Sequence, residues 1–233
     1  MSRSLAPQPA RLPPPQAVFF DLDGTLADTA EDLVAPIHIM RRERGLAPMP
    51  FDELRPFASM GARGLIGKGL GVHRDAPEFA ALRDEFLARY EAAMLVNTRL
   101  FTGMAEVLDA LDAHGIRWGV ISNKVERYVR PILDGLGLLQ RAACAIGGDT
   151  TAFAKPHPEP LLHGARLTGV DTLLSVYVGD DLRDVEAGRA AAMRTVAAAY
   201  GFCGDAQPPH QWGADHLVER PIELLDLFDL RAD

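Results

Sequence analysis

Residues 17–25 read AVFFDLDGT, and this stretch decides the fold class of the chain. Its first four residues are apolar and include β-prone valine and phenylalanine, which predicts a short buried strand. Two aspartates, a glycine and a threonine follow almost at once, so the strand is expected to end in a polar loop that begins at Asp21.

Helix and strand signals alternate over the second half of the chain. Further strands are expected at four short β-prone runs, residues 118–121, 144–146, 174–178 and 195–197, and each lies next to helix-compatible sequence. This alternation is typical of a parallel sheet with helices on both faces. In such sheets, ligands bind beyond the carboxyl ends of the strands. The predicted fold class is therefore α/β, with a Rossmann-like parallel sheet.

Residues 28–99 break this alternation and are predicted to be helical. One helix is expected to begin near Asp28 and end at Gly45, and a second begins near Pro77 with apolar residues on one face. The glycine-rich residues 64–69 lack the spacing of a phosphate-binding loop and are expected to form a mobile turn.

The predicted organisation has three parts. They are a disordered, proline-rich N-terminal extension (residues 1–16), an α/β core (17–27 and 100–233) and an all-helical cap inserted into that core (28–99).

Composition excludes several classes of function. The 233 residues are 48% apolar and 24% charged, as in soluble globular proteins. A net charge of −8 opposes binding to nucleic acid and gives no attraction to an anionic membrane. Cys144 and Cys203 lack zinc-ligand spacing and do not form a disulfide framework. No apolar run is long enough for a secretory signal or a membrane span, so the predicted location is cytoplasmic, and no protein partner is indicated.

Acidic and hydroxyl-bearing side chains follow three of the predicted strands. They are Asp21 and Asp23, then Ser122 and Asn123, then Asp180, Asp181 and Asp184. Because parallel strand ends meet at one edge of the sheet, Asp21, Asp23 and Asp180 are expected to lie together. Carboxylates so close repel one another unless a cation lies among them, and an all-oxygen site suits Mg²⁺.

These stretches resemble the four motifs of the haloacid dehalogenase superfamily of Mg²⁺-dependent phosphotransferases. The motifs read FDLDGTL at residues 20–26, VISN at 120–123, AKPHP at 154–158, and VGDD at 178–181 followed by Asp184. The resemblance covers residues 17 to about 228. It implies that the helical stretch between the first two motifs is the helical cap of the family.

The resemblance also implies catalytic and metal-binding roles. Asp21 would be the nucleophile that becomes an aspartyl phosphate, and Asp23 the general acid and base. Mg²⁺ would be held by the Asp21 carboxylate, the Asp23 main-chain carbonyl and Asp180, with Asp184 orienting these ligands.

Substrate binding is expected to involve both parts of the chain. Ser122 and Lys155 would hold the phosphoryl oxygens, and Asn123 is also expected to bind the substrate. Arg63 is the candidate that reaches over the site from the cap, since an arginine binds a carboxylate bidentately. Other arginines are open alternatives: Arg55, Arg74 and Arg99.

The expected activity is hydrolysis of a small phosphorylated metabolite. Asp23 and the metal-binding set favour a phosphatase over a dehalogenase. The chain resembles phosphoglycolate phosphatases, and residues 178–215 are also similar to N-acetylmuramate 6-phosphate phosphatases, which is the alternative. A phosphomutase and a catalytically inactive binding module are weaker alternatives.

Overall fold

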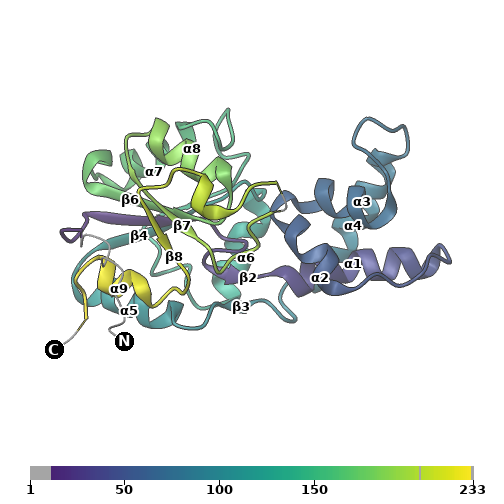
Figure 1. The fold of residues 1–233 in the computed structure, drawn as a ribbon, viewed down its shortest axis with the longest axis horizontal. Coiled ribbons are helices and arrows are strands. Elements are labelled where there is room, and N and C mark those ends of the chain that lie inside the picture. The colour runs from purple at the N-terminus through teal and green to yellow at the C-terminus, as the bar shows by residue number, and fades with distance from the viewer. Residues whose placement is uncertain (1–11, 205, 232–233) are drawn as a thin grey trace, which may run out of the picture.

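A six-stranded parallel sheet with helices on both faces forms the core of the computed structural model, which describes residues 12–204 and 206–231 (Figure 1). The strand order is β5-β4-β1-β6-β7-β8, and every neighbouring pair is parallel. The strands are β1 (Ala17–Phe20), β4 (Arg117–Ile121), β5 (Ala145–Ile146), β6 (Ser175–Gly179), β7 (Arg194–Ala198) and β8 (His216–Val218). The predicted α/β fold class is confirmed. β8 was not predicted, because its sequence, HLV, begins with a polar histidine and is not a continuous β-prone run.

Both faces of the central strand β1 are buried by helices. Alternate residues point to opposite sides. Val18 and Phe20 pack with residues of α5 (Met104–Ala113), α6 (Glu126–Gly135) and α9 (Glu223–Leu227), whereas Ala17 and Phe19 pack with α7 (Glu159–Thr168) and α8 (Leu182–Ala190). Burial on both faces explains why β1 reads as a continuous apolar run.

Residues 28–99, called the helical insertion below, contain four α-helices and a 3-10 helix. They are α1 (Ala30–Glu43), α2 (Phe51–Leu54), η1 (Arg55–Met60), α3 (Gly61–Leu70) and α4 (Phe79–Ala93). Leu33, Ile37, Leu65 and Phe86 belong to an apolar cluster made largely by these helices. This separate cluster supports the proposed division of the chain into a core and a helical cap.

The expected mobile turn at residues 64–69 is wrong, because these residues lie within helix α3. The glycines allow close packing instead. A Cβ atom on Gly69 would lie 2.4 Å from Ile37 Cγ2, and one on Gly64 would lie 2.7 Å from the carbonyl oxygen of Phe57. Both contacts are far shorter than van der Waals distance, so the absence of a side chain lets α3 approach its neighbours.

The N-terminal extension was predicted as disordered over residues 1–16, and this is wrong for residues 12–16. Leu12 is buried in the core, and its amide donates to the carbonyl of Leu227 over 2.8 Å. The Gln16 amide donates to the carbonyl of Leu174 over the same distance. Burial and paired backbone groups anchor this segment on the core. Residues 1–11, which complete that prediction, lie outside the described residues.

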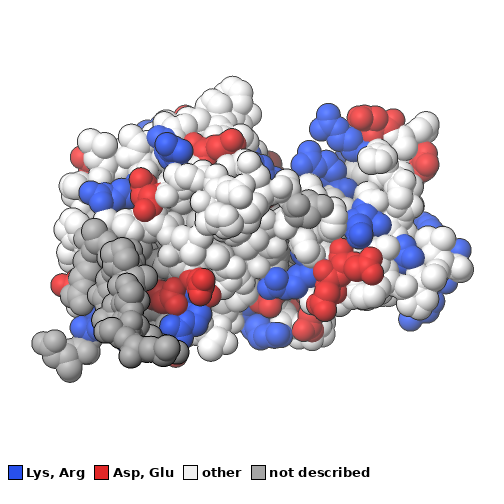
Figure 2. All heavy atoms as spheres, viewed as in Figure 1, with Lys and Arg blue, Asp and Glu red and all other residues white. Residues whose placement is uncertain are grey.

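Acidic and basic side chains are interspersed over the face of the molecule seen in Figure 2. None of the helices in the described part of the chain has the length and apolar character needed to cross a bilayer. Cys144 and Cys203 are free thiols. Burial raises the pKa of Cys144 to about 12, so this thiol stays protonated at neutral pH.

Two short antiparallel strands mark the places where the chain enters and leaves the helical insertion. β2 (Ala27–Asp28) pairs with β3 (Arg99–Leu100), so the two crossings lie side by side. The buried carboxylate of Asp32, in α1, accepts hydrogen bonds from the backbone amides and side chains of Asn97 and Thr98. This carboxylate therefore fastens the end of the insertion to its beginning.

Asp32→Ala is expected to lower the free energy of unfolding by about 3 kcal/mol, because it removes a buried acceptor that the backbone amides and side chains of Asn97 and Thr98 share. Urea denaturation measures this change. Asp84→Ala is the control: it removes an exposed ion pair with Arg83 and is expected to change the stability by less than about 0.5 kcal/mol. Equal losses in the two variants would contradict the assigned role of Asp32.

Candidate active site

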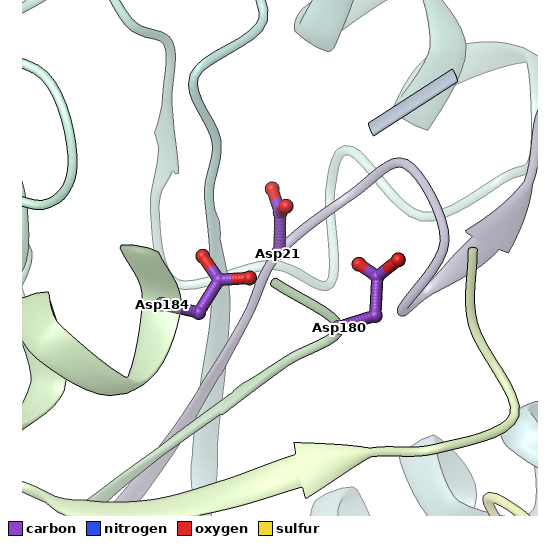
Figure 3. Close-up of side chains that lie close together, drawn as sticks. All are labelled: Asp21, Asp180 and Asp184. Carbon is purple, nitrogen blue, oxygen red and sulfur yellow. The ribbon is translucent and has the colours of Figure 1, made fainter. Parts of the chain in front are cut away.

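Three carboxylates meet at the carboxyl ends of β1 and β6 (Figure 3). Asp21 follows β1, Asp180 follows β6, and Asp184 lies in the first turn of α8. Each offers an oxygen within 4.8 Å of the others. Burial raises the pKa of Asp180 well above its ordinary value, and the charges of Asp21 and Asp184 raise it further. The cluster is therefore a buried concentration of negative charge that a bound cation would stabilise.

The surroundings of Asp180 fix its carboxylate in one orientation. Thr25 donates its hydroxyl to one oxygen over 2.9 Å, and the Phe202 amide donates to the other over 2.9 Å. A Cβ on Gly24 would lie 2.2 Å from the second oxygen, so only glycine leaves room for this arrangement. An oriented, all-oxygen donor set of this kind suits a hard cation such as Mg²⁺.

Lys155 reaches into the same cluster from the loop between β5 and α7. Its ammonium lies 3.1 Å from Asp21 Oδ1, 2.7 Å from Asp184 Oδ1 and 2.8 Å from the hydroxyl of Tyr177. Burial opposes its charge, but Asp184 and Asp21 outweigh burial and raise the pKa of Lys155 above its usual value. This buried lysine is therefore a fixed positive charge beside Asp21.

Two further residues hold Lys155 in place. Tyr177 accepts from the ammonium and donates to the carbonyl of Ile121 over 2.6 Å. The Asn123 side chain accepts from the Lys155 amide and donates to the Lys155 carbonyl, both over 2.9 Å. The Asn123 side chain was predicted to bind substrate; its oxygen and nitrogen each bond the backbone of Lys155, and contact with substrate stays a prediction. Tyr177 was not predicted, because its only signal was one hydroxyl within an apolar strand.

The side chain of Asp23 is turned toward a second lysine. Lys124 Nζ lies 3.1 Å from each carboxylate oxygen of Asp23, and the Thr29 hydroxyl donates to one of them over 2.6 Å. Burial opposes the charge of Lys124, but the Asp23 carboxylate and the Tyr90 hydroxyl together outweigh it, so the pKa of this lysine is raised. Lys124 was missed. Its signals were its place directly after Ser122 and Asn123 and the scarcity of lysine in the chain.

Asp184 takes the place that was predicted for the Asp23 side chain in the carboxylate cluster. The first turn of α8 brings Asp184 back toward Asp21 and Asp180, and its carboxylate accepts from the Asp181 amide over 3.1 Å in a capping box. Strand order alone places residues that directly follow a strand, and it does not predict which way a residue two positions further on is turned.

A cavity of about 580 Å³ lies between the core and the helical insertion. Residues of the core supply one wall: Asp21, Asp23, Ser122, Asn123, Lys124, Lys155 and Asp184. The helical insertion supplies the other wall, which includes Ser59, Arg63, Arg83, Phe86 and Tyr90. Arg63 lies on α3 and makes no ion pair with a described residue, so its guanidinium is available to a ligand. Ser122 is buried at the end of β4.

Two arginines connect the helical insertion to the core beside this cavity. Arg183 forms a two-pronged ion pair with Asp181 and also donates to the carbonyl of Ser59 over 2.9 Å. Arg55 donates to the carbonyl of Gly201 over 3.1 Å, and its guanidinium lies 5.1 Å from the ring centre of Phe202. These contacts hold η1 against the start of α8 and against the loop that follows β7.

Comparison with known proteins identifies the family. A model of the haloacid dehalogenase-like hydrolases matches residues 18–198. The chain is 46% identical to a phosphoglycolate phosphatase of Xanthomonas campestris, over 90% of this chain and 95% of the relative. It is 41% identical to an N-acetylmuramic acid 6-phosphate phosphatase of Pseudomonas aeruginosa, over 92% and 95% of the two chains.

Solved structures agree with these relatives. A predicted phosphoglycolate phosphatase from Haemophilus somnus superposes with a TM-score of 0.80 at 26% identity, covering 91% of this chain and 97% of that one. The family match spans the strand ends and loops that carry Asp21, Ser122, Lys155 and Asp180. The chain therefore belongs to the haloacid dehalogenase-like hydrolases and is a phosphatase of that family.

Proposed function

We propose that the protein is a Mg²⁺-dependent phosphomonoesterase that acts through an aspartyl phosphate formed on Asp21. The observation that carries this proposal is the buried cluster of Asp21, Asp180 and Asp184, with the ammonium of Lys155 in contact with two of its members. When bound, Mg²⁺ would be held by the Asp21 carboxylate, the Asp23 main-chain carbonyl and Asp180, and it would offset the charge of the phosphoryl group.

Each residue at the cavity has a task that its position supports. An oxygen of Asp21 attacks phosphorus, and the bond to the leaving oxygen breaks. Lys155 and Ser122 hold the phosphoryl oxygens on which charge develops. Asp23 protonates the leaving alkoxide and then takes a proton from the water that hydrolyses the aspartyl phosphate. Lys124 and Thr29 keep the Asp23 carboxylate oriented, and separate from the cluster, for this task.

The proposed substrate is 2-phosphoglycolate, which gives glycolate and phosphate. Relatives at 46% identity are phosphoglycolate phosphatases, and Arg63 offers an unpaired guanidinium for the substrate carboxylate. N-acetylmuramate 6-phosphate is the second candidate, favoured by the relative at 41% identity and by the size of the cavity. Comparing kcat/KM on the two compounds tests the choice. The cytoplasmic location stays a prediction.

Asp21→Asn is expected to lower kcat at least about 1000-fold, because a neutral amide is a poor nucleophile toward phosphorus. Phosphate release measures kcat, and thermal unfolding checks that the variant is folded. Asp109→Asn is the matched control, since Asp109 is exposed on α5 and, among the described residues, pairs only with Arg141. Substantial turnover by the Asp21 variant would overturn the assignment of the nucleophile.

Removing divalent metal with a chelator is expected to abolish phosphate release, and added Mg²⁺ is expected to restore it. Mg²⁺ is also expected to raise the midpoint of thermal unfolding, because a ligand that binds only the folded state stabilises it. Asp180→Asn is expected to weaken this rise. Hydrolysis that continues unchanged in the chelator, with no thermal shift in Mg²⁺, would contradict the metal site.

Tyr177→Phe is expected to lower kcat about tenfold while KM changes less than twofold, because the Lys155 ammonium loses one of the acceptors that orient it. Steady-state kinetics separate the two constants. Lys155 acts on charge that develops in the transition state, so its misplacement should affect turnover more than binding. A lower unfolding midpoint with unchanged kcat would show that Tyr177 only stabilises the fold.

A further inference from the structure

We infer that the helical insertion helps to hold a metal ligand of the core in place, and that Arg55, on η1, is the positioning residue for the carboxylate of Asp180. Arg55 acts through residues 199–204, called the connecting loop below, which follow β7 and reach the helical insertion (Figure 1). This inference rests on the proposed Mg²⁺ site. It adds that the binding of Mg²⁺ and the docking of η1 on the connecting loop strengthen each other.

The connecting loop holds Asp180 through its backbone. The Phe202 amide donates to Asp180 Oδ2 over 2.9 Å, and the Cys203 amide donates to the same oxygen over 3.4 Å. The other oxygen, Oδ1, accepts from the Thr25 hydroxyl over 2.9 Å. Because the carboxylate is buried, these donors decide which way its oxygens face. A displacement of the loop backbone would therefore turn a proposed ligand of Mg²⁺.

The connecting loop also packs closely against the residues around Asp180. The Tyr200 hydroxyl donates to the carbonyl of Thr25 over 3.0 Å. A Cβ atom on Gly201 would lie 2.3 Å from Asp180 Cβ and 2.3 Å from the carbonyl oxygen of Gly24. Packing this close transmits a shift of one segment to the next. The position of the loop and the position of the carboxylate are therefore tied together.

The same loop is docked on the helical insertion. The Arg55 guanidinium donates to the carbonyl of Gly201 over 3.1 Å and lies 5.1 Å from the ring centre of Phe202. The Phe202 ring is buried in the apolar cluster made largely by the helical insertion. Phe202 thus has its ring among residues of the helical insertion and its amide on Asp180. It joins the two parts of the chain within one residue.

Arg55 was an open alternative to Arg63 for contact with the substrate, and its surroundings favour a different role. Arg63 and Arg83 line the cavity, whereas Arg55 is not among the described residues that line it. A planar guanidinium can donate within its plane and also lie over an aromatic ring. Arg55 makes both contacts with consecutive residues of the connecting loop, Gly201 and Phe202. These contacts suit a residue that acts on the loop.

Coupling of this kind works in both directions. If docking of Arg55 keeps the Phe202 amide on Asp180, it raises the affinity of the site for Mg²⁺. By linkage, Mg²⁺ bound to the oriented carboxylate stabilises the docked arrangement by the same factor. Mg²⁺ is therefore expected to slow hydrogen–deuterium exchange of the backbone amides of η1, although none of them belongs to the proposed metal site.

Calorimetric titration of Mg²⁺ into the full chain, without substrate, tests the inference. Arg55→Ala is expected to raise the Kd for Mg²⁺ roughly three- to tenfold, because the loop loses its charged donor and Asp180 is held less firmly. Arg55→Lys keeps a charged donor and is expected to recover part of this loss. The slowing of exchange in η1 by Mg²⁺ is expected to be smaller in Arg55→Ala than in the wild-type chain. If Arg55→Ala fails to fold, Arg55→Met keeps the length of the side chain without its donors.

Arg44→Ala is the matched control. Arg44 also donates to a main-chain carbonyl, that of Met40, and it pairs with Glu85, but both partners belong to the helical insertion. Its loss is expected to change the Kd for Mg²⁺ less than about twofold. An unchanged Kd in a folded Arg55 variant, whatever its unfolding midpoint, would overturn the inference and leave the proposed function standing. A wild-type chain that binds no Mg²⁺ would refute the proposed metal site, and the inference with it.

Discussion

The structure depends on the burial of carboxylates that cannot balance one another. Asp21, Asp180 and Asp184 share a site with one ammonium, that of Lys155, so three carboxyl groups face one positive charge. A divalent cation is the simplest group that makes this set neutral. Asp23 is balanced separately by Lys124. The two pairings keep the proposed nucleophile and the proposed acid electrically distinct, although only Leu22 separates them in the chain.

Sheet order and glycine packing create this concentration of charge. β1 lies between β4 and β6, so the loops that follow these three strands start at neighbouring points on one edge. Gly24 and Gly201 leave room for Asp180, and Gly179 does the same for Asp184, where a Cβ would lie 2.3 Å from the carboxyl carbon. The close approach of the carboxylates therefore depends on the placement of the backbone as much as on the acidic residues themselves.

The fold and the aspartates that directly follow a strand were predictable, because the sequence patterns that indicate them lie within a few consecutive residues. A strand followed directly by an aspartate can be recognised from consecutive residues, as at Asp21 and Asp180. The contacts of the helical insertion were not predictable in this way. Position 69 requires glycine because Ile37 Cγ2 lies 2.4 Å from where a Cβ would be, and Lys124 matters because Asp23 contacts it across 101 positions of sequence. Such pairings depend on tertiary packing, which the periodicity of apolar residues along the sequence does not reveal.

Lys124 connects the chemistry of the core to the wall of the helical insertion. Its ammonium bonds Asp23 and lies against the ring of Tyr90, so the proposed proton donor and one wall of the cavity share one cation. Arg183 links Ser59 to the helix that carries Asp184 in a similar way. Two residues of the cavity wall, Tyr90 and Ser59, are therefore each one contact away from a residue that is bound to, or adjacent to, a carboxylate of the core. Binding of a substrate against this wall and proton transfer by Asp23 would then be coupled through Lys124.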